Sequence, residues 1–275
     1  MTSPKVMLRS RTRSDLRSPS WGGRATHQTR RTSPGARQTG GIGLVGNLLP
    51  SPEEWAVRNQ ALAQTLAELV NSHAPTKTGR GLEVGCQWGV LLDCLAGYTT
   101  LRWWGVDPVI GRHRSRSGWE LFNGFADDLP FGDSVFDCVV LANVYEHIDP
   151  DRRAASLREI RRVLVPGGIL VGQLPNPHFP LESHSKLPFM GWLPPRWQDT
   201  YWKLSPARRG PGFHSVTIRD LRRRAERAGF ERLLVRNFSY PPEAAPTSVR
   251  WLARVLERPM KVMPWAWQFV FSRSR

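Results

Sequence analysis

The first hydrophobic periodicity along the chain begins at Ser51. Pro52 follows it and Glu54 lies three positions on, which is typical of a capping box at the start of a helix. Apolar side chains then recur at helical spacing as far as Val70. The pattern therefore predicts a helix over residues 52–71.

From residue 81 onward, short apolar runs alternate with amphipathic stretches. Strands that are separated by helices favour a parallel sheet with both faces covered, and right-handed crossovers make such a sheet doubly wound. We therefore expect an α/β fold. The expected strands cover residues 81–85, 101–107, 119–126, 136–142, 168–173, 231–240 and 267–272, and the expected helices cover residues 88–95, 152–164, 217–229 and 249–256.

Two stretches break this rhythm. Residues 174–214 hold many Pro, Trp and His residues with little periodicity, so we expect a lid or insertion over the carboxyl edge of the sheet. Residues 1–48 hold nine Lys or Arg against one Asp and few large apolar side chains, which predicts a disordered basic tail. The expected organisation is this tail followed by one domain over residues 49–275 that includes the insertion.

Charge and cysteine content narrow the function classes. The 275 residues carry a formal net charge of +16, but no zinc finger, RNA-recognition motif or basic zipper accompanies it, so no specific nucleic acid is expected as a partner. A solvated extension is the favoured interpretation of the tail, with a transit peptide and nucleic-acid attraction as alternatives. Three widely spaced Cys argue against a zinc ribbon or a disulfide framework and fit a reducing, cytoplasmic environment. No apolar run is long enough to predict a membrane-spanning helix.

The segment E-V-G-C-Q-W-G over residues 83–89 lies between an expected strand and an expected helix. Glycines in such a turn let backbone N–H groups approach a ligand closely at the N-terminus of the helix. Asp107 ends the next strand, where a carboxylate accepts hydrogen bonds from ribose hydroxyls in doubly wound folds. A dinucleotide fingerprint fails because Gln87 occupies its second glycine position, and no P-loop is present. These features indicate a nucleoside-containing ligand at the carboxyl edge.

Five segments in this order resemble the class I S-adenosylmethionine-dependent methyltransferases, most closely the type 11 branch with its quinone and small-molecule enzymes. They are E-x-G-x-x-x-G at residues 83–89, G-V-D at 105–107, A-D-D-L-P-F at 126–131, F-D-C-V-V-L-A-N-V-Y-E-H at 136–147 and R-V-L-V-P-G-G at 162–168. The resemblance covers about residues 50–272 and implies a mostly parallel seven-stranded sheet of Rossmann-like type. It also implies S-adenosylmethionine as cofactor and a small-molecule or lipid-like acceptor, with a hydroxyl slightly favoured over an amine.

The resemblance further implies which residues hold the cofactor. The glycine turn would line the methionine half, Asp107 would hold the ribose diol, and the Ala126 N–H would meet the adenine ring. Asn143 would lie next to the methyl group and contact the methionine amine, while Glu83 would orient the turn. The full set of expected cofactor-binding residues is Glu83, Gly85, Cys86, Gly89, Asp107, Ala126, Asp127 and Asn143.

His147 and His184 are the candidate catalytic residues. Methyl transfer needs a base only when the nucleophile must lose a proton, as a hydroxyl does, and the pKa range of histidine suits that role. His147 follows the fourth expected strand, and a structural or substrate-orienting role is its alternative. His184 lies in the insertion near Glu182, where packing is an equal alternative to substrate contact. No metal site is expected, because no close ligand cluster is visible.

Departures from the family pattern keep other functions open. Gln87 stands where a further Gly is usual, Phe125 stands where Asp is frequent, and the segment between Asp107 and Gly124 is too short for the usual second helix. A degenerate, non-catalytic cofactor-binding module is therefore the alternative. A nucleic-acid methyltransferase is a weaker one, because no N-P-P-Y signature follows the fourth strand. The basic amphipathic helix over residues 249–256 and the tryptophans of the insertion leave peripheral membrane contact open.

Overall fold

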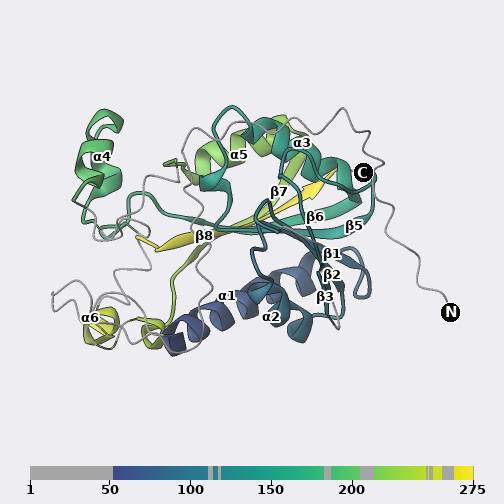
Figure 1. Cartoon of the computed structure of the whole chain (residues 1–275), viewed down its shortest axis with the longest axis horizontal. Helices are drawn as coiled ribbons and strands as arrows, with labels where there is room; N and C mark the ends of the chain where they lie inside the picture. The colour runs from purple at the N-terminus through teal and green to yellow at the C-terminus, as the bar shows by residue number, and fades with distance from the viewer. Residues whose placement is uncertain are drawn as a thin grey trace.

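The computed structural model describes residues 52–110, 114–116, 119–182, 187–204, 214–245, 247, 250–255 and 263–274. Within this part of the chain, eight strands form one sheet in the order β3-β4-β2-β1-β5-β6-β8-β7 (Figure 1). The neighbours from β4 to β6 run parallel, and β8 is antiparallel to both β6 and β7. The strands are β1 (Arg80–Val84), β2 (Arg102–Val106), β3 (Arg114–Arg116), β4 (Trp119–Phe122), β5 (Phe136–Ala142), β6 (Leu164–Pro175), β7 (Phe230–Phe238) and β8 (Ala266–Arg273).

Helices cover both faces of this sheet. The helices α1 (Pro52–His73) and α2 (Val90–Tyr98) lie on one face, and α3 (Arg153–Val163) and α5 (Ile218–Arg227) lie on the other (Figure 1). Each pair packs on its own apolar core against the strands. The expected doubly wound α/β fold is therefore confirmed.

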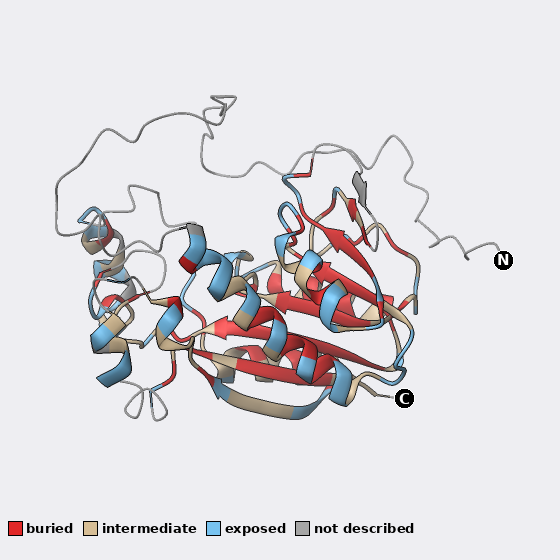
Figure 2. Ribbon diagram, turned by 90° about the horizontal axis from the view of Figure 1, so that it is seen from below, coloured by how far each residue is buried: buried red, intermediate tan, exposed pale blue. Residues whose placement is uncertain are grey.

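The central strands explain why the sequence shows short uninterrupted apolar runs. In β5, Val139 and Leu141 belong to the core on the α3 and α5 side, whereas Cys138 and Val140 belong to the core on the α1 and α2 side. Successive side chains of a strand point to opposite faces, so a strand that is covered on both sides must be apolar at every position. Figure 2 shows the result, with buried strands between helices whose outer faces are exposed.

All seven expected strands are present in the sheet, and an eighth strand, β3, is not predicted by the sequence pattern. It pairs antiparallel with β4 at the edge of the sheet, with Ser115 opposite Glu120. Its three residues are Arg, Ser and Arg, so no apolar alternation marks them as a strand. This strand stands in the described part of the segment that the sequence analysis judged too short for a helix.

The expected insertion over residues 174–214 contains more regular structure than its sequence suggests. The helix α4 (Pro195–Trp202) follows the short 3-10 helix η4 (Met190–Trp192), and both pack around a small separate core. That core contains Leu187, Met190 and Trp202. Eight residues give α4 too few turns for a clear 3.6-residue period, so the sequence pattern missed it.

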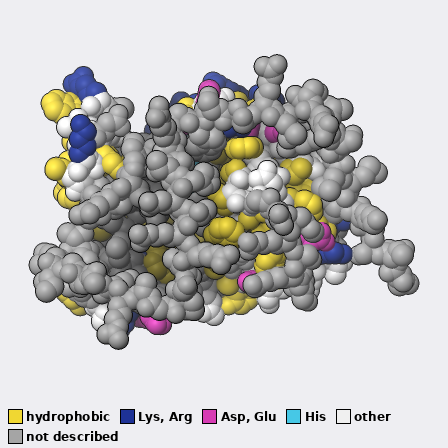
Figure 3. Space-filling view, in the orientation of Figure 1, with side chains coloured by type: hydrophobic (Ala, Val, Ile, Leu, Met, Phe, Trp, Pro, Cys, Tyr) yellow, Lys and Arg dark blue, Asp and Glu magenta, His cyan; other side chains and the backbone are white. Residues whose placement is uncertain are grey.

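The insertion presents aromatic side chains to solvent. Trp192 and Trp197 are each more than half exposed, and the α4 protrusion carries both apolar and basic side chains at the edge of the molecule (Figure 3). The short helix expected over residues 249–256 is present as α6 (Arg250–Val255), on which Trp251 is also exposed. The helices α4 and α6 lie at the same end of the sheet (Figure 1). No helix in the described residues is long and apolar enough to cross a membrane.

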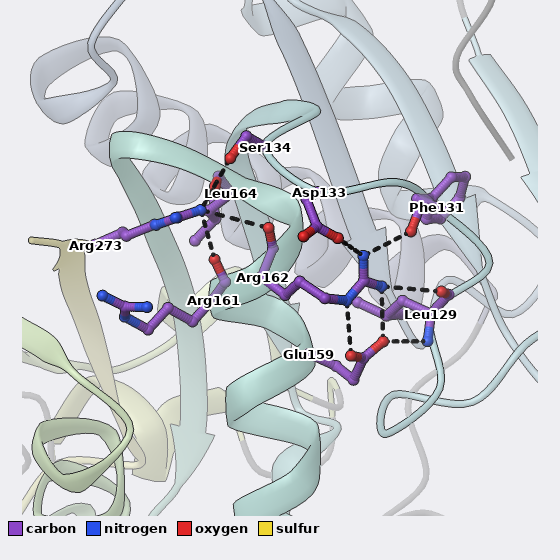
Figure 4. Close-up of polar contacts among 9 residues, drawn as sticks. All are labelled: Leu129, Phe131, Asp133, Ser134, Glu159, Arg161, Arg162, Leu164 and Arg273. Atoms are coloured by element: carbon purple, nitrogen blue, oxygen red, sulfur yellow. Dashed lines mark hydrogen bonds and ion pairs between the residues drawn. The ribbon is translucent and has the colours of Figure 1, made fainter. Parts of the chain in front are cut away.

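Hydrogen bonds from the guanidinium of Arg162 attach the loop that precedes β5 to the helix α3. The Arg162 side chain donates to both carboxylate oxygens of Glu159 at 2.8 Å and to an Asp133 carboxylate oxygen at 2.7 Å (Figure 4). It also donates to the carbonyl oxygens of Phe131 and Leu129, and Glu159 accepts from the Leu129 N–H. These bonds satisfy a mostly buried cation and hold the loop that continues from the 126–131 motif.

Candidate active site

A cavity of about 480 Å³ opens at the carboxyl ends of β1, β2 and β5. In doubly wound sheets this edge is where ligands bind. Four of the five sequence motifs meet in the cavity, because its wall includes the turn after β1, Asp107 after β2, Ala126 with Asp127, and the segment that begins at Ala142 of β5. The wall is completed by the 124–127 turn, by Trp55, Asn59 and Leu62 of α1, and by Arg152 and Ser156 at the start of α3.

The turn after β1 requires left-handed backbone at alternate positions. Gly85 has φ +80°, Gln87 has φ +47° and Gly89 has φ +82°. The Gly85 N–H donates to the Val106 carbonyl oxygen at 2.8 Å, which holds the turn against the end of β2. A Cβ atom on Gly85 would lie 2.3 Å from a methyl carbon of Val144. Glycine is therefore needed at this position for both its backbone conformation and its lack of a side chain.

Gln87 is the residue in this turn that departs from the usual glycine, and its left-handed backbone costs about 1–2 kcal/mol in a residue with a Cβ. A Gln87→Gly variant should therefore be more stable than Gln87→Ala by about 1 kcal/mol, because only the alanine keeps the unfavourable backbone. Urea unfolding of both variants measures the difference. Equal stability of the two would show that Gln87 carries no backbone strain.

Asp107 connects the turns after β1 and β2. One of its carboxylate oxygens accepts from the Gln87 N–H at 2.9 Å, and the other accepts from the Val109 N–H at 2.9 Å. The side chain is buried at the cavity wall. The structure thus brings Asp107 next to the glycine turn that begins at Gly85, as the sequence motifs require.

Glu83, the last polar residue of β1, is buried beneath the same turn. Burial, with the nearby Asp107 carboxylate as a second cause, raises the pKa of Glu83 from 4.5 to about 8. One of its carboxylate oxygens has no hydrogen-bond partner. Burial also raises the pKa of the Cys86 thiol, with Glu83 as the next cause, so that thiol is neutral. This corner of the cavity therefore holds a carboxyl group and a thiol that are both protonated at neutral pH.

The raised pKa of Glu83 predicts how stability depends on pH. The folded chain keeps a proton on Glu83 up to about pH 8 that the unfolded chain releases near pH 4.5, so the contribution of this group to stability falls between about pH 4.5 and 8 and levels off above pH 8. Between pH 6 and 9, the unfolding free energy of the wild type should fall by about 2–3 kcal/mol more than that of Glu83→Gln. Urea unfolding at both pH values tests this. The exposed Glu231→Gln is the control and should keep the wild-type pH dependence, and a Glu83→Gln variant that also kept it would contradict the prediction.

Ala126 and Asp127 lie on the cavity wall, but Asp127 is held by a residue that the sequence analysis did not assign. Both Asp127 oxygens accept from Arg152 at 2.6 Å, and the Arg152 guanidinium lies over the Phe125 ring at 5.1 Å. Asp127 therefore anchors Arg152 beside the cavity. No local signal predicts this pair, because 25 residues separate its members.

Asn143 ends β5 with a left-handed backbone, at φ +55°. Its N–H donates to the Gln173 carbonyl oxygen at 2.9 Å, and its side-chain oxygen accepts from the Gln173 amide at 3.1 Å. The residue lies on the cavity wall, so its side chain links the cavity to the end of β6.

Of the two candidate catalytic histidines, the structure places one at the cavity. His147 lies in the 3-10 helix η3 (Tyr145–His147), is exposed and forms part of the cavity wall. His184 lies outside the described residues. The described residues contain no group of His, Cys, Asp or Glu side chains that could hold a metal ion.

The sequence analysis missed the contribution of α1 to this site. Trp55 and Asn59 line the cavity, although the helix precedes every strand. Helical periodicity marks Trp55 as a residue on the apolar face, but it does not show what that face covers.

Residues 55–235, which are well over half of the chain, match the methyltransferase domain family. The chain belongs to this family. It is a methyltransferase that depends on S-adenosylmethionine, and the match does not distinguish the type 11 branch from others. No curated protein matches the sequence.

Solved structures share the fold of this methyltransferase at low sequence identity. An S-adenosylmethionine-dependent methyltransferase from Mesorhizobium loti is 18% identical with a TM-score of 0.54, over 78% of this chain and 100% of its own. One from Thermotoga maritima, described as a possible histamine N-methyltransferase, is 18% identical with a TM-score of 0.51, over 81% of this chain and 94% of its own. The [4+2]-cyclase SpnF is also 18% identical, with a TM-score of 0.50 over 77% of this chain and 80% of its own. The fold alone therefore does not identify the acceptor.

Proposed function

We propose that this methyltransferase transfers the methyl group of S-adenosylmethionine to a small-molecule or lipid-like acceptor, with a hydroxyl slightly favoured over an amine. The observation that carries the proposal is the cavity in which the glycine turn, Asp107 and Asn143 meet. The apolar side chains of Trp55, Leu62 and Val144 on the cavity wall support an acceptor with apolar character.

The residues of the cavity fit the cofactor. The backbone of the glycine turn lines the cavity, and one oxygen of the buried Glu83 has no hydrogen-bond partner and can accept from an N–H of the ligand. We infer that the cofactor is held by Glu83, Gly85, Cys86, Gly89, Asp107, Ala126, Asp127 and Asn143. When bound, S-adenosylmethionine supplies an electrophilic methyl group on a positively charged sulfur.

The chain itself contributes mainly alignment. Holding two reactants in line can be worth about 7–11 kcal/mol of the barrier. His147 stands at the exposed rim of the cavity, where it can take the proton that a hydroxyl acceptor loses. His184, in the insertion, is proposed to contact the acceptor.

The two departures from the family pattern do not close the site. Gln87 and Phe125 both form part of the cavity wall, and the cavity of about 480 Å³ remains open beside them. This favours an enzyme over a non-catalytic module that only binds the cofactor.

Transfer of a radioactive methyl group to a panel of phenols, aliphatic alcohols and primary amines tests the proposal. We expect labelling of hydroxyl compounds, and a loss of about 100-fold or more in rate when His147 is replaced by Gln. That loss should be smaller for amines, which need no base if they bind unprotonated. Binding of S-adenosylhomocysteine without labelling of any compound would favour the non-catalytic module instead.

A further inference from the structure

Arg58 of α1 lies among three aromatic rings. Its guanidinium carbon is 4.4 Å from the centre of the Tyr240 ring, 5.1 Å from that of Trp55 and 5.4 Å from that of Trp265. Its Nε is buried and has no hydrogen-bond partner. Aromatic faces stabilise a cation, but they do not accept the in-plane hydrogen bonds that a guanidinium can donate.

No carboxylate among the described residues balances this charge. The nearest acid along the helix, Glu54, lies one turn earlier and accepts instead from the Thr247 N–H and hydroxyl and from Arg250, at 2.8–3.1 Å. A partly buried guanidinium without a counter-ion is costly unless a ligand supplies the negative charge. The three rings thus hold a cation whose Nε–H has no hydrogen-bond partner.

Arg58 does not itself line the cavity, but its guanidinium carbon is 5.1 Å from the ring centre of Trp55, which does. Trp55 precedes it by three residues and Leu62 follows it by four, so all three share one face of α1, and both neighbours line the cavity. Hydrogen bonds between side chains also connect Tyr240, which contacts Arg58, with the cavity wall. The Tyr240 hydroxyl accepts from the Gln173 amide at 3.2 Å, and the same amide donates to Asn143 on the cavity wall.

Gln173 adds an independent sign of a missing ligand. Its side chain is 1% exposed, and its amide oxygen has no hydrogen-bond partner. A buried amide oxygen without a donor is uncommon, because it loses the hydrogen bond that water would supply. The amide nitrogen of the same side chain connects Asn143 on the cavity wall with Tyr240, which leaves the oxygen as the unpaired acceptor of this group.

We propose that Arg58 binds a carboxylate of the methyl acceptor, so that the acceptor is a small organic acid that also carries a hydroxyl or an amine. This rests on the proposed function and names the acceptor class. One guanidinium balances one negative charge, which favours a carboxylate over a phosphate. Trp55, one of the three rings around Arg58, also lines the cavity and provides an apolar surface for the body of such an acid.

Binding of matched probes to the full chain saturated with S-adenosylhomocysteine tests this. The probes are 4-hydroxybenzoate, its neutral analogue 4-hydroxybenzamide, and 4-hydroxyphenyl phosphate. Isothermal titration should show that the wild type binds the benzoate about tenfold or more tightly than the amide, as expected for a charged hydrogen bond. Arg58→Gln should abolish this preference, and Arg58→Lys should retain part of it.

Controls separate this role from a structural one. The exposed Arg219 on α5 provides the matched variant Arg219→Gln, which should keep the wild-type preference despite the same change in net charge. Affinity for S-adenosylhomocysteine should be unchanged in every variant. If S-adenosylhomocysteine binds but the wild type fails to bind or to prefer the benzoate, or Arg58→Gln keeps the preference, the carboxylate site is wrong while the proposed function stands. Preference for the phosphate would overturn the choice of a carboxylate, and failure of S-adenosylhomocysteine to bind would overturn the proposed function itself.

Discussion

A Gly85→Ala variant should lose cofactor binding while remaining folded. The new Cβ would lie 2.3 Å from a methyl carbon of Val144, and the backbone at φ +80° is unfavourable for any residue with a Cβ. The turn that lines the cavity must then move, which also disturbs the bond between Gln87 and Asp107. We expect at least about a 100-fold weaker affinity for S-adenosylhomocysteine, which corresponds to about 2.7 kcal/mol. Isothermal titration measures it.

Two alanine variants at other glycines separate the causes. Gly167 also has a left-handed backbone, at φ +77°, but a Cβ there would meet nothing within 4 Å, so Gly167→Ala should lower stability without changing affinity. Gly97 is an exposed position in α2 with open space around it, so Gly97→Ala should be neutral or stabilising. Wild-type affinity in Gly85→Ala would show that the turn does not contact the cofactor.

Replacing Arg162 by Met should cause the largest loss of stability. Its guanidinium satisfies Glu159, Asp133 and two backbone carbonyl groups, and its removal leaves the mostly buried Glu159 carboxylate without its cation (Figure 4). Breaking a buried pair in this way costs about 3–5 kcal/mol. Urea unfolding should show that loss. The exposed Arg158→Met on the same helix is the control and should change the unfolding free energy by less than about 0.5 kcal/mol. Equal effects of the two variants would contradict the assigned role of Arg162.

The sequence pattern predicted those strands and helices whose burial or capping residues lie within the segment itself. The run over residues 136–142 became β5, because a strand covered on both faces must be apolar throughout. The helix α5 begins after Thr217, whose hydroxyl accepts from the Asp220 N–H as a helix cap. By contrast, β3 pairs with β4, and that pairing leaves no signature in its Arg-Ser-Arg sequence.

The candidate site was predictable only where a motif is contiguous. The turn that begins at Gly85 could be recognised because its glycines and the following helix are neighbours in sequence. The pair of Asp127 with Arg152 and the aromatic surroundings of Arg58 come from distant segments, so only the folded chain shows them. A side chain that pairs across the fold carries no periodic signal.

The most direct test of the central claim is titration of the full chain with S-adenosylhomocysteine, for the wild type and for Asp107→Ala. Our account predicts binding at one site per chain, weakened about tenfold or more in the variant, because the Asp107 carboxylate would no longer meet the ribose. Absence of binding to the wild type, or equal affinity of the two proteins, would contradict it.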